Sequence, residues 1–289
     1  MIRARFSRLL ITCALSLVAS GNAVTQEPPP SPASARILLV PWRMVSGERA
    51  TLAVLDVHGR LTPNVNVAFS NGDKIRTDKT GRALYVAPLN AGVLFASISG
   101  RPGRVKTTVV PPEESAAAGV EVASAPRTAS LRDRFTLIGG GFCGDADKNE
   151  VTIGGKSALV LASSPLALQV LPPMDLDPGP ARVDLSCGKQ SLGSFTVDFL
   201  SLELDADSSH LAPGQKRSMV VRVTGTAERV SLEARNLSTD VVQLTEGNPA
   251  KLLSSGGTEN VAKFEIVGRN KGKILISIRL VPQYTRPRS

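Results

Sequence analysis

Hydrophobic residues occur along this chain in short runs that glycine and proline interrupt. The pattern is clearest between residues 135 and 199, where breaks fall at Gly154-Gly155, Pro172-Pro173 and Pro178-Gly179. Short apolar runs bounded by such residues are typical of the strands of a β-sandwich. The strands predicted in this stretch are 150–153, 157–161, 166–171, 181–185 and 194–199.

A second group of runs precedes this stretch and has the turns of a sheet protein. Asn71-Gly72 is a strong hairpin signal, because both residues tolerate a positive φ, and Asp78 to Gly81 forms a further tight turn. Seven short strands in so short a segment predict another sandwich. These strands are 37–40, 50–56, 65–70, 74–77, 83–87, 93–98 and 105–110.

A third β-rich unit follows from about residue 200 without an evident linker. One face of 219–223 and of 263–267 is apolar and the other mixed, as expected for a sheet that is covered on one side. A long polar insertion covers 248–260, and the chain ends in an exposed tail. The predicted strands are 202–204, 218–223, 230–234, 241–244, 261–267 and 274–280.

The residues before the first unit differ in composition from the predicted sandwiches. Residues 1–23 combine a basic start, an apolar run and a small-residue exit, the pattern of a secretory signal peptide. No later run is long enough for a transmembrane segment, so we expect the exported chain outside the cytoplasm. The predicted organisation is a signal peptide (1–23), a proline-rich spacer (24–35), a sandwich (36–110), a linker (111–119), a second sandwich (120–199), a third β-rich domain (200–282) and a tail (283–289).

Motifs in the first two units resemble known modules. Over about residues 37–110, the chain resembles the bacterial immunoglobulin-like repeats of invasin and intimin type surface proteins, in the motifs Ser46 to Leu52, Asp56 to Pro63, Val65 to Ser70 and Thr77 to Ala83. Phe135 to Phe142 and Pro178 to Leu185, with the pieces between them, resemble an IPT/TIG domain over about residues 120–199. Both resemblances imply an all-β fold of tandem immunoglobulin-like sandwiches. The first one supports a fold and a compartment far more than an activity.

The cysteines favour a disulfide. Cys13 lies in the predicted signal peptide and lacks the small residues of a lipoprotein cleavage site before it, which leaves Cys143 and Cys187. An even pair in an exported chain favours a disulfide over a metal site or a reactive thiol. A loop of this size closed by a disulfide stabilises a fold by about 3 to 4 kcal/mol in the chain-entropy model.

The charge of the chain gives little indication of a partner. The formal net charge is +9, and three arginines lie in the signal peptide, so the exported chain keeps 31 basic residues against 25 acidic ones, a net +6. The cations are scattered and have no interleaved aromatics to stack on bases, which argues against nucleic-acid binding. Solvated surfaces explain them, and the alternative is a loose attraction to anionic polysaccharide or lipid.

Two motifs could hold a ligand, and both are better explained as structure. Gly139 to Gly141 lack the following helix and lysine of a phosphate loop, so they indicate a sharp bend that returns Phe142 to the core. The polar residues Asp145, Asp147 and Asn149 begin like a calcium loop, but the later ligand positions are missing. We expect a polar loop there, with a shallow calcium site as the alternative.

Catalytic chemistry is poorly supported. His58 and His210 fit surface turns, no nucleophile elbow is present, and we predict no catalytic, cofactor or metal site. The sequence therefore favours a non-enzymatic exported protein, an interaction, adhesion or spacer module at the bacterial surface or in the periplasm, whose partner is an envelope protein or polysaccharide. The alternative is a polysaccharide-binding accessory protein of a carbohydrate-active system.

Overall fold

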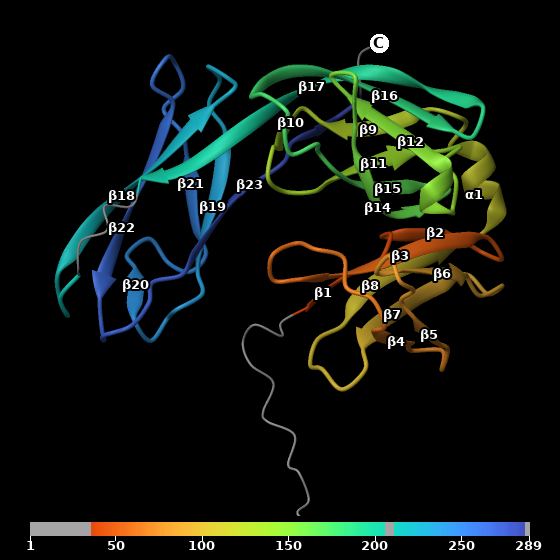
Figure 1. Ribbon diagram of the computed structural model, residues 1–289, viewed down its shortest axis with the longest axis horizontal. Helices are drawn as coiled ribbons and strands as arrows, with labels where there is room; N and C mark the ends of the chain where they lie inside the picture. Colours follow the sequence, from red (N-terminus) through yellow and green to blue (C-terminus); the bar gives the residue numbers. More distant parts are fainter. Residues whose placement is uncertain (1–35, 206–210, 287–289) are drawn as a thin grey trace, which may run out of the picture.

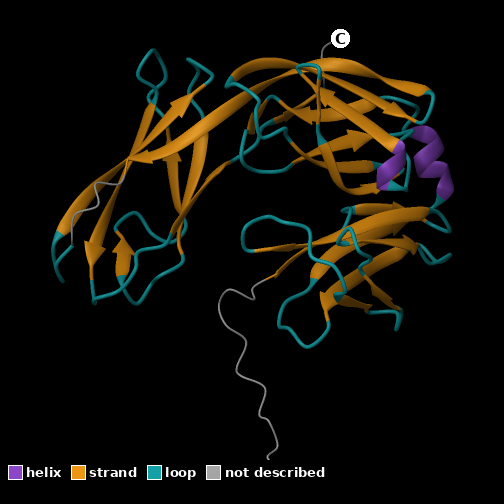
Figure 2. Cartoon of the chain, in the orientation of Figure 1, coloured by secondary structure: helices purple, strands orange, loops and turns teal. Residues whose placement is uncertain are grey.

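The structure is a computed structural model that describes residues 36–205 and 211–286. The predicted signal peptide (1–23), the whole of the predicted spacer (24–35) and His210 lie outside the described residues. Almost every element is a strand, as Figure 2 shows, which confirms the all-β fold class predicted from the sequence. Within the described ranges, no helix is both long and apolar enough to cross a membrane.

The first unit is a sandwich of two sheets. One sheet has the order β2-β8-β7-β4-β5, and the other contains β1, β3 and β6. Alternate residues of the strands point into a core that includes Leu52, Val67, Tyr85 and Leu94. The strands are β1 (Arg36–Leu39), β2 (Arg43–Val45), β3 (Arg49–Asp56), β4 (Asn66–Phe69), β5 (Lys74–Arg76), β6 (Arg82–Val86), β7 (Gly92–Ile98) and β8 (Val105–Val110).

The middle unit has its own core, which packs around Leu137, Ile153, Val170 and Phe199. The rings of Phe135 and Phe199 meet edge to face in this core, with centroids 5.8 Å apart. Its strands are β9 (Val122–Pro126), β10 (Thr128–Ser130), β11 (Phe135–Gly139), β12 (Asn149–Ile153), β13 (Lys156–Ser157), β14 (Leu159–Ser164), β15 (Ala167–Leu171), β16 (Gly179–Cys187) and β17 (Gln190–Asp205).

The third unit packs two sheets around Leu232, Phe264 and Ile266. One sheet is formed by the second half of β17 with β18, β22 and β20, and the other has the order β21-β19-β23. The polar stretch 248–260 is not wholly irregular, because it contains β21, which pairs with β19. The strands are β18 (Lys216–Thr224), β19 (Ser231–Asn236), β20 (Val242–Leu244), β21 (Ala250–Leu253), β22 (Val261–Gly268) and β23 (Ile276–Leu280).

The first two units share a sheet. β3 of the first unit pairs in antiparallel fashion with β14 of the middle unit, with Thr51 opposite Ser163. A small apolar cluster that includes Leu55 and Leu161 joins the two units where β3 faces β14. In Figure 1 the two units lie directly against each other. They are therefore packed together rather than strung along the chain.

The segment 111–119 differs from the linker that we expected. It contains a six-residue helix, α1 (Pro112–Ala117), with proline at its first position and two glutamates in its first turn. Glu114 forms an ion pair with Arg43 of the first unit. Next to the helix, Val45, Val110 and Leu166 form a buried contact between the two units. The segment is thus a folded connection at a packed junction.

The middle and third units are joined at two places. β17 is one continuous strand that pairs with β16 in the middle unit and with β18 in the third unit (Figure 1). The chain end then returns from the third unit as β24 (Tyr284–Thr285), which pairs with β9 of the middle unit. The tail predicted at 283–289 is exposed where it is described, but it is also a paired strand.

Candidate functional site

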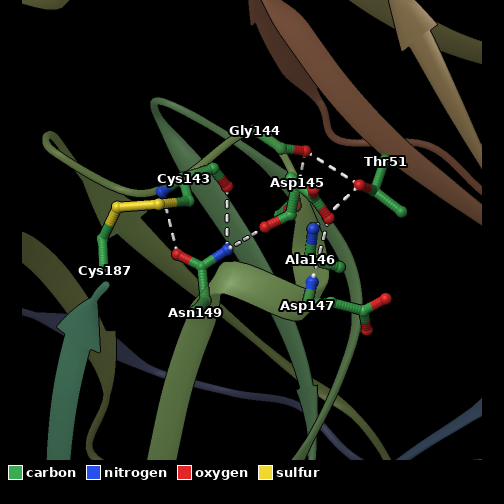
Figure 3. The surroundings of a disulfide bond; sticks show 9 residues. Thr51, Cys143, Gly144, Asp145, Ala146, Asp147, Asn149 and Cys187 are labelled. Atoms are coloured by element: carbon green, nitrogen blue, oxygen red, sulfur yellow. Dashed lines mark hydrogen bonds between the residues drawn. A yellow bond between two sulfur atoms is a disulfide. The ribbon is translucent and has the colours of Figure 1, made fainter. Parts of the chain in front are cut away.

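Cys143 and Cys187 are joined by a disulfide, with their Cα atoms 5.5 Å apart (Figure 3). Cys187 ends β16 and lies opposite Asn149, the first residue of β12. The disulfide therefore fastens the loop between β11 and β12 to the sheet of the middle unit. The same two cysteines are the pair predicted from the sequence.

The three glycines before Cys143 form the sharp corner that the sequence predicted. A Cβ atom on Gly139 would lie 2.2 Å from the carbonyl oxygen of Glu121, and one on Gly140 would lie 2.1 Å from that of Gly119. The strand register shifts at Gly139, and Phe142 then enters the core. These glycines allow two backbones to approach closely, as expected for glycine at an irregular strand end.

The polar side chains after Cys143 are engaged by the protein itself. Asn149 is buried, and its side chain accepts a hydrogen bond from the Cys143 N–H and donates to the carbonyl oxygens of Cys143 and Asp145. Asp145 accepts from the Asp147 N–H and caps the 3₁₀ turn Ala146–Lys148. The Asp147 carboxylate forms an ion pair with Arg82. Asp145, Asp147 and Asn149, the residues of the calcium alternative, thus hold the polar loop together through these hydrogen bonds and the ion pair.

This loop docks on the first unit. The Thr51 hydroxyl of β3 donates to the carbonyl oxygen of Gly144 at 2.8 Å and accepts from the Ala146 N–H at 2.9 Å (Figure 3). The Ser163 hydroxyl donates to the same Gly144 oxygen at 2.9 Å. A Cβ atom on Gly144 would lie 1.9 Å from the carbonyl oxygen of Arg49, so only glycine fits. The loop fastened by the disulfide is also a contact between two units.

His58, the histidine that the structure describes, lies in the exposed turn after β3. Its backbone N–H donates to the carboxylate of Asp56. The Arg60 N–H donates to the same carboxylate, and this hydrogen bond is the main cause that lowers the pKa of Asp56. In the described part of the chain, no group of three or more His, Cys, Asp and Glu side chains could hold a metal ion.

The largest of the described cavities lies in the third unit and has a volume of about 1110 Å³. It opens beside the end of β17 that is farther from the middle unit. Its lining comes from the strands β17, β18 and β22, from the segment 211–215 before β18 and from the segment 270–275 after β22. Its apolar lining includes Leu204, Leu211, Met219, Val242, Ile266 and Ile276.

Three basic side chains belong to the described lining of this cavity. Arg217, Lys271 and Lys273 line it, and the described lining contains no carboxylate. Arg217 lies directly opposite Ile266 on the neighbouring strand, so both side chains leave the sheet on the same, inner face. In the sequence, Lys271 and Lys273 belong to the scattered cations that solvated surfaces explain. No sequence signal shows that the fold places Arg217 beside them.

Comparison with known proteins gives distant likenesses alone. No protein-family model matches the sequence, and no curated protein matches it either. One similar solved structure is the Bacteroides ovatus mixed-linkage glucan utilization locus SGBP-B in complex with a mixed-linkage heptasaccharide. It is 13% identical with a TM-score of 0.31, covering 83% of this chain and 71% of that one.

Two further solved structures are similar at the same level. Surface layer protein SbsC, domains 1–6, is 14% identical with a TM-score of 0.20, covering 89% of this chain and 40% of that one. The plexin A4 extracellular region is 8% identical with a TM-score of 0.33, covering 89% of this chain and 28% of that one. At these identities and TM-scores, none of the likenesses supports a functional argument.

Proposed function

We propose that this chain is an exported, non-enzymatic interaction module of the bacterial cell surface or periplasm, built from immunoglobulin-like units at a fixed spacing. The proposal includes the finer assignment of 120–199 as an IPT/TIG domain and of 36–110 as an immunoglobulin-like domain of invasin and intimin type. Those assignments rest on the sequence motifs around Phe135 to Phe142 and Thr77 to Ala83.

The observation that carries the proposal is the way in which the units are joined. A flexible linker leaves neighbouring units free to move, whereas a shared sheet and a continuous strand fix their positions. Here β3 meets β14, β17 passes through two units, and β24 returns to β9. Such an arrangement suits a protein that holds a binding surface at a set distance from its attachment point.

Export is supported by two independent features. Residues 1–23 have the pattern of a signal peptide, and the exported part of the chain carries a disulfide between Cys143 and Cys187. Disulfides persist in oxidising compartments such as the periplasm and the cell surface. Both features favour an extracytoplasmic location for the described units.

The test is photocrosslinking in intact cells. A photoreactive residue replaces, one at a time, an exposed apolar side chain of each unit: Leu89, Met174 or Leu253, which are 82%, 86% and 59% exposed. A specific interface covers one face of one unit, so we expect an adduct with one envelope protein from one of the three positions. Equal labelling from all three would indicate random collisions and would count against the proposal. Hydrolysis of an envelope polymer by the purified protein would overturn its non-enzymatic part.

Polysaccharide binding in a carbohydrate-active system is the second candidate, and Trp42 favours it. This Trp is 43% exposed, and the Arg43 guanidinium lies 5.3 Å from the centroid of its ring. Small-molecule binding sites are lined mostly by hydrophobic and aromatic side chains. In this case Trp42→Ala would abolish retention on insoluble polysaccharide, while Leu89→Ala, which removes a more exposed apolar side chain, would leave retention unchanged. Retention that survives Trp42→Ala would count against this candidate.

A further inference from the structure

We infer that the outer face of the five-stranded sheet in the first unit binds a linear anionic polysaccharide. The inference deepens the second candidate function and rests on it, because it assigns a charge to the polymer and a face to its binding. Trp42, which favours that candidate, lies at the β2 edge of this sheet, where the Thr108 N–H of β8 donates to its carbonyl oxygen at 3.0 Å.

Lysines of two separate strands point to this outer face. In an antiparallel sheet, side chains that lie directly opposite each other leave the sheet on the same face. Lys74 of β5 lies opposite Ala68 of β4, and Ala68 lies opposite Ser97 of β7. Phe95, two positions before Ser97, lies opposite Lys106 of β8. The residues that alternate with them belong to the core of the unit, so both lysines stand on the outer face.

Two arginines join the lysines on this face. Arg76 is the next outward residue of β5 after Lys74 and lies opposite Asn66. The Arg104 guanidinium lies over the Phe95 ring, 4.3 Å from its centroid. All four cations are exposed, and none of them forms an ion pair with a residue that the structure describes. Their charges are therefore open to an anionic partner.

The described strands of this sheet carry no acid, and neither does the segment 99–104 between β7 and β8. Asp73 precedes Lys74, but its carboxylate accepts from the Tyr85 hydroxyl of the facing sheet and so points away from the outer face. Arg43 of β2 is already paired with Glu114 and does not belong to the set. Several sheet cations of the other two units, by contrast, have an acid beside them. These pairs are Arg222 with Glu203, Arg279 with Glu233 and Arg182 with Asp184.

The spread of the charges matches an extended polymer. Lys74 and Lys106 stand three strands apart in the order β5-β4-β7-β8, which is about 14 Å across the sheet. Ala68 and Ser97 between them are small and half-buried. An anionic chain that lies across these small residues meets cations on both sides. Each exposed contact is weak, but several contacts on one polymer reinforce each other.

The test is a fluorescence-anisotropy titration of labelled oligogalacturonate with the full exported chain. The matched neutral probe is the same oligomer with its carboxylates methyl-esterified. Salt screens exposed charges, so we expect binding of oligogalacturonate that weakens as the ionic strength rises, and binding of the ester that is weaker by about tenfold or more. Equal binding of the two oligomers would overturn the inference. Binding to phosphatidylglycerol vesicles without binding to oligogalacturonate would overturn it in favour of a lipid surface.

Two outcomes separate this inference from the candidate function on which it rests. Retention on an uncharged polysaccharide that depends on Trp42, without binding of oligogalacturonate, would overturn the inference and leave the candidate standing. Absence of binding to every polysaccharide, charged and uncharged, would overturn both.

Variants identify the face. Lys74→Glu with Lys106→Glu should weaken binding of oligogalacturonate by about tenfold or more, because two attractions become repulsions. Lys251→Glu with Lys263→Glu is the matched control, since both lysines are exposed in the third unit and the net charge changes equally. Lys74→Gln with Lys106→Gln adds no acid and should weaken binding by a smaller factor. Equal loss in the two glutamate pairs would show that net charge alone attracts the polymer, which would refute the assignment to this face.

Discussion

The hydroxyl group of Thr51 makes two of the hydrogen bonds between the first and the middle unit. Thr51 lies in β3, where the other residues from Ala50 to Leu55 are apolar, and its side chain leaves the strand on the side that faces the middle unit, where it is buried. It donates to the oxygen of Gly144 and accepts from the N–H of Ala146, so both of its polar functions are used. A buried polar group with all its partners specifies one arrangement of the surfaces that it connects.

Replacing this hydroxyl by a methyl group tests its contribution. Thr51→Val keeps the shape of the side chain but leaves the Ala146 N–H without its acceptor, and the unsatisfied group should lower the free energy of unfolding by about 1 to 3 kcal/mol. The measurement is chemical denaturation. Thr196→Val is the control, because Thr196 is exposed on β17, and its effect should stay within about 0.5 kcal/mol. Equal effects of the two changes would show that Thr51 has no special role.

Tyr85 is the residue whose ionisation should affect the fold at high pH. Its ring stacks on Phe69 with centroids 4.1 Å apart, and its hydroxyl donates to the Asp73 carboxylate at 2.8 Å. Burial, and then the hydrogen bond to Asp73, raise the pKa of Tyr85 to about 12. The folded state thus favours the neutral phenol. The resulting stabilisation is present below the ordinary tyrosine pKa of about 10 and is lost as the pH rises from there through about 12.

The sequence has two tyrosines, so Tyr284→Phe isolates this titration. In that variant, absorbance of the phenolate should rise with a midpoint near pH 12 while the chain is folded, as the pKa of Tyr85 requires. After denaturation the midpoint should return to about 10. A midpoint near 10 in the folded protein would contradict the burial and hydrogen bonding of Tyr85.

At the scale of elements, the strands with their own apolar alternation were predictable. The sequence indicates 105–110 and 261–267, and the structure has β8 and β22 there. The elements it misses depend on partners from elsewhere: β2 is three residues long and pairs with β8, and β21 lies in a polar stretch. Short strands carry too little periodicity to be recognised without the neighbour that they pair with.

The local features of the site were predictable in the same way, and the tertiary ones were not. Consecutive glycines before Phe142 indicate a corner from backbone sterics alone, and two cysteines in an exported chain indicate a disulfide. The docking of Gly144 on Thr51 joins residues 93 positions apart. Likewise, the cavity exists only after β18 and the segment 270–275 are folded together.

Docking of the two-residue strand β24 should protect the backbone N–H of Arg127 from hydrogen exchange. The Arg127 N–H between β9 and β10 donates to the carbonyl oxygen of Gln283 at 2.8 Å, just before β24. Removing 283–289 should therefore speed hydrogen exchange at Arg127, because its acceptor is lost. The Leu131 N–H, which donates to Leu200 at 2.9 Å, is the internal control and should keep its rate. Unchanged exchange at Arg127 would mean that β24 does not dock in solution.

At the scale of the whole molecule, the junction of the first two units should survive a break in the chain. A recognition sequence for a site-specific protease, inserted after Ala117, allows cleavage within 111–119. Because β3 and β14 and the cluster around Leu55 and Leu161 hold the units together, we expect the two fragments to elute as one species under native conditions. They should separate in denaturant.

The control is a variant that introduces a charge into the contact between the first and the middle unit. Leu161 is buried between the units, so Leu161→Asp in the same cleavable chain should let the fragments separate without denaturant, since an unpaired carboxylate cannot stay in an apolar contact. Separation of the unmodified fragments under native conditions would show that α1, rather than the interface, connects the units.

The continuous strand β17 gives the molecule a mechanical property. It has 16 residues and therefore extends about 53 Å at a rise of 3.3 Å per residue. A force that pulls the third unit away from the middle unit acts along this strand, so its hydrogen bonds to β16 and β18 are loaded together in shear rather than broken one after another. A module that joins two bodies under tension, such as a cell and the surface to which it adheres, would resist extension most strongly along this strand.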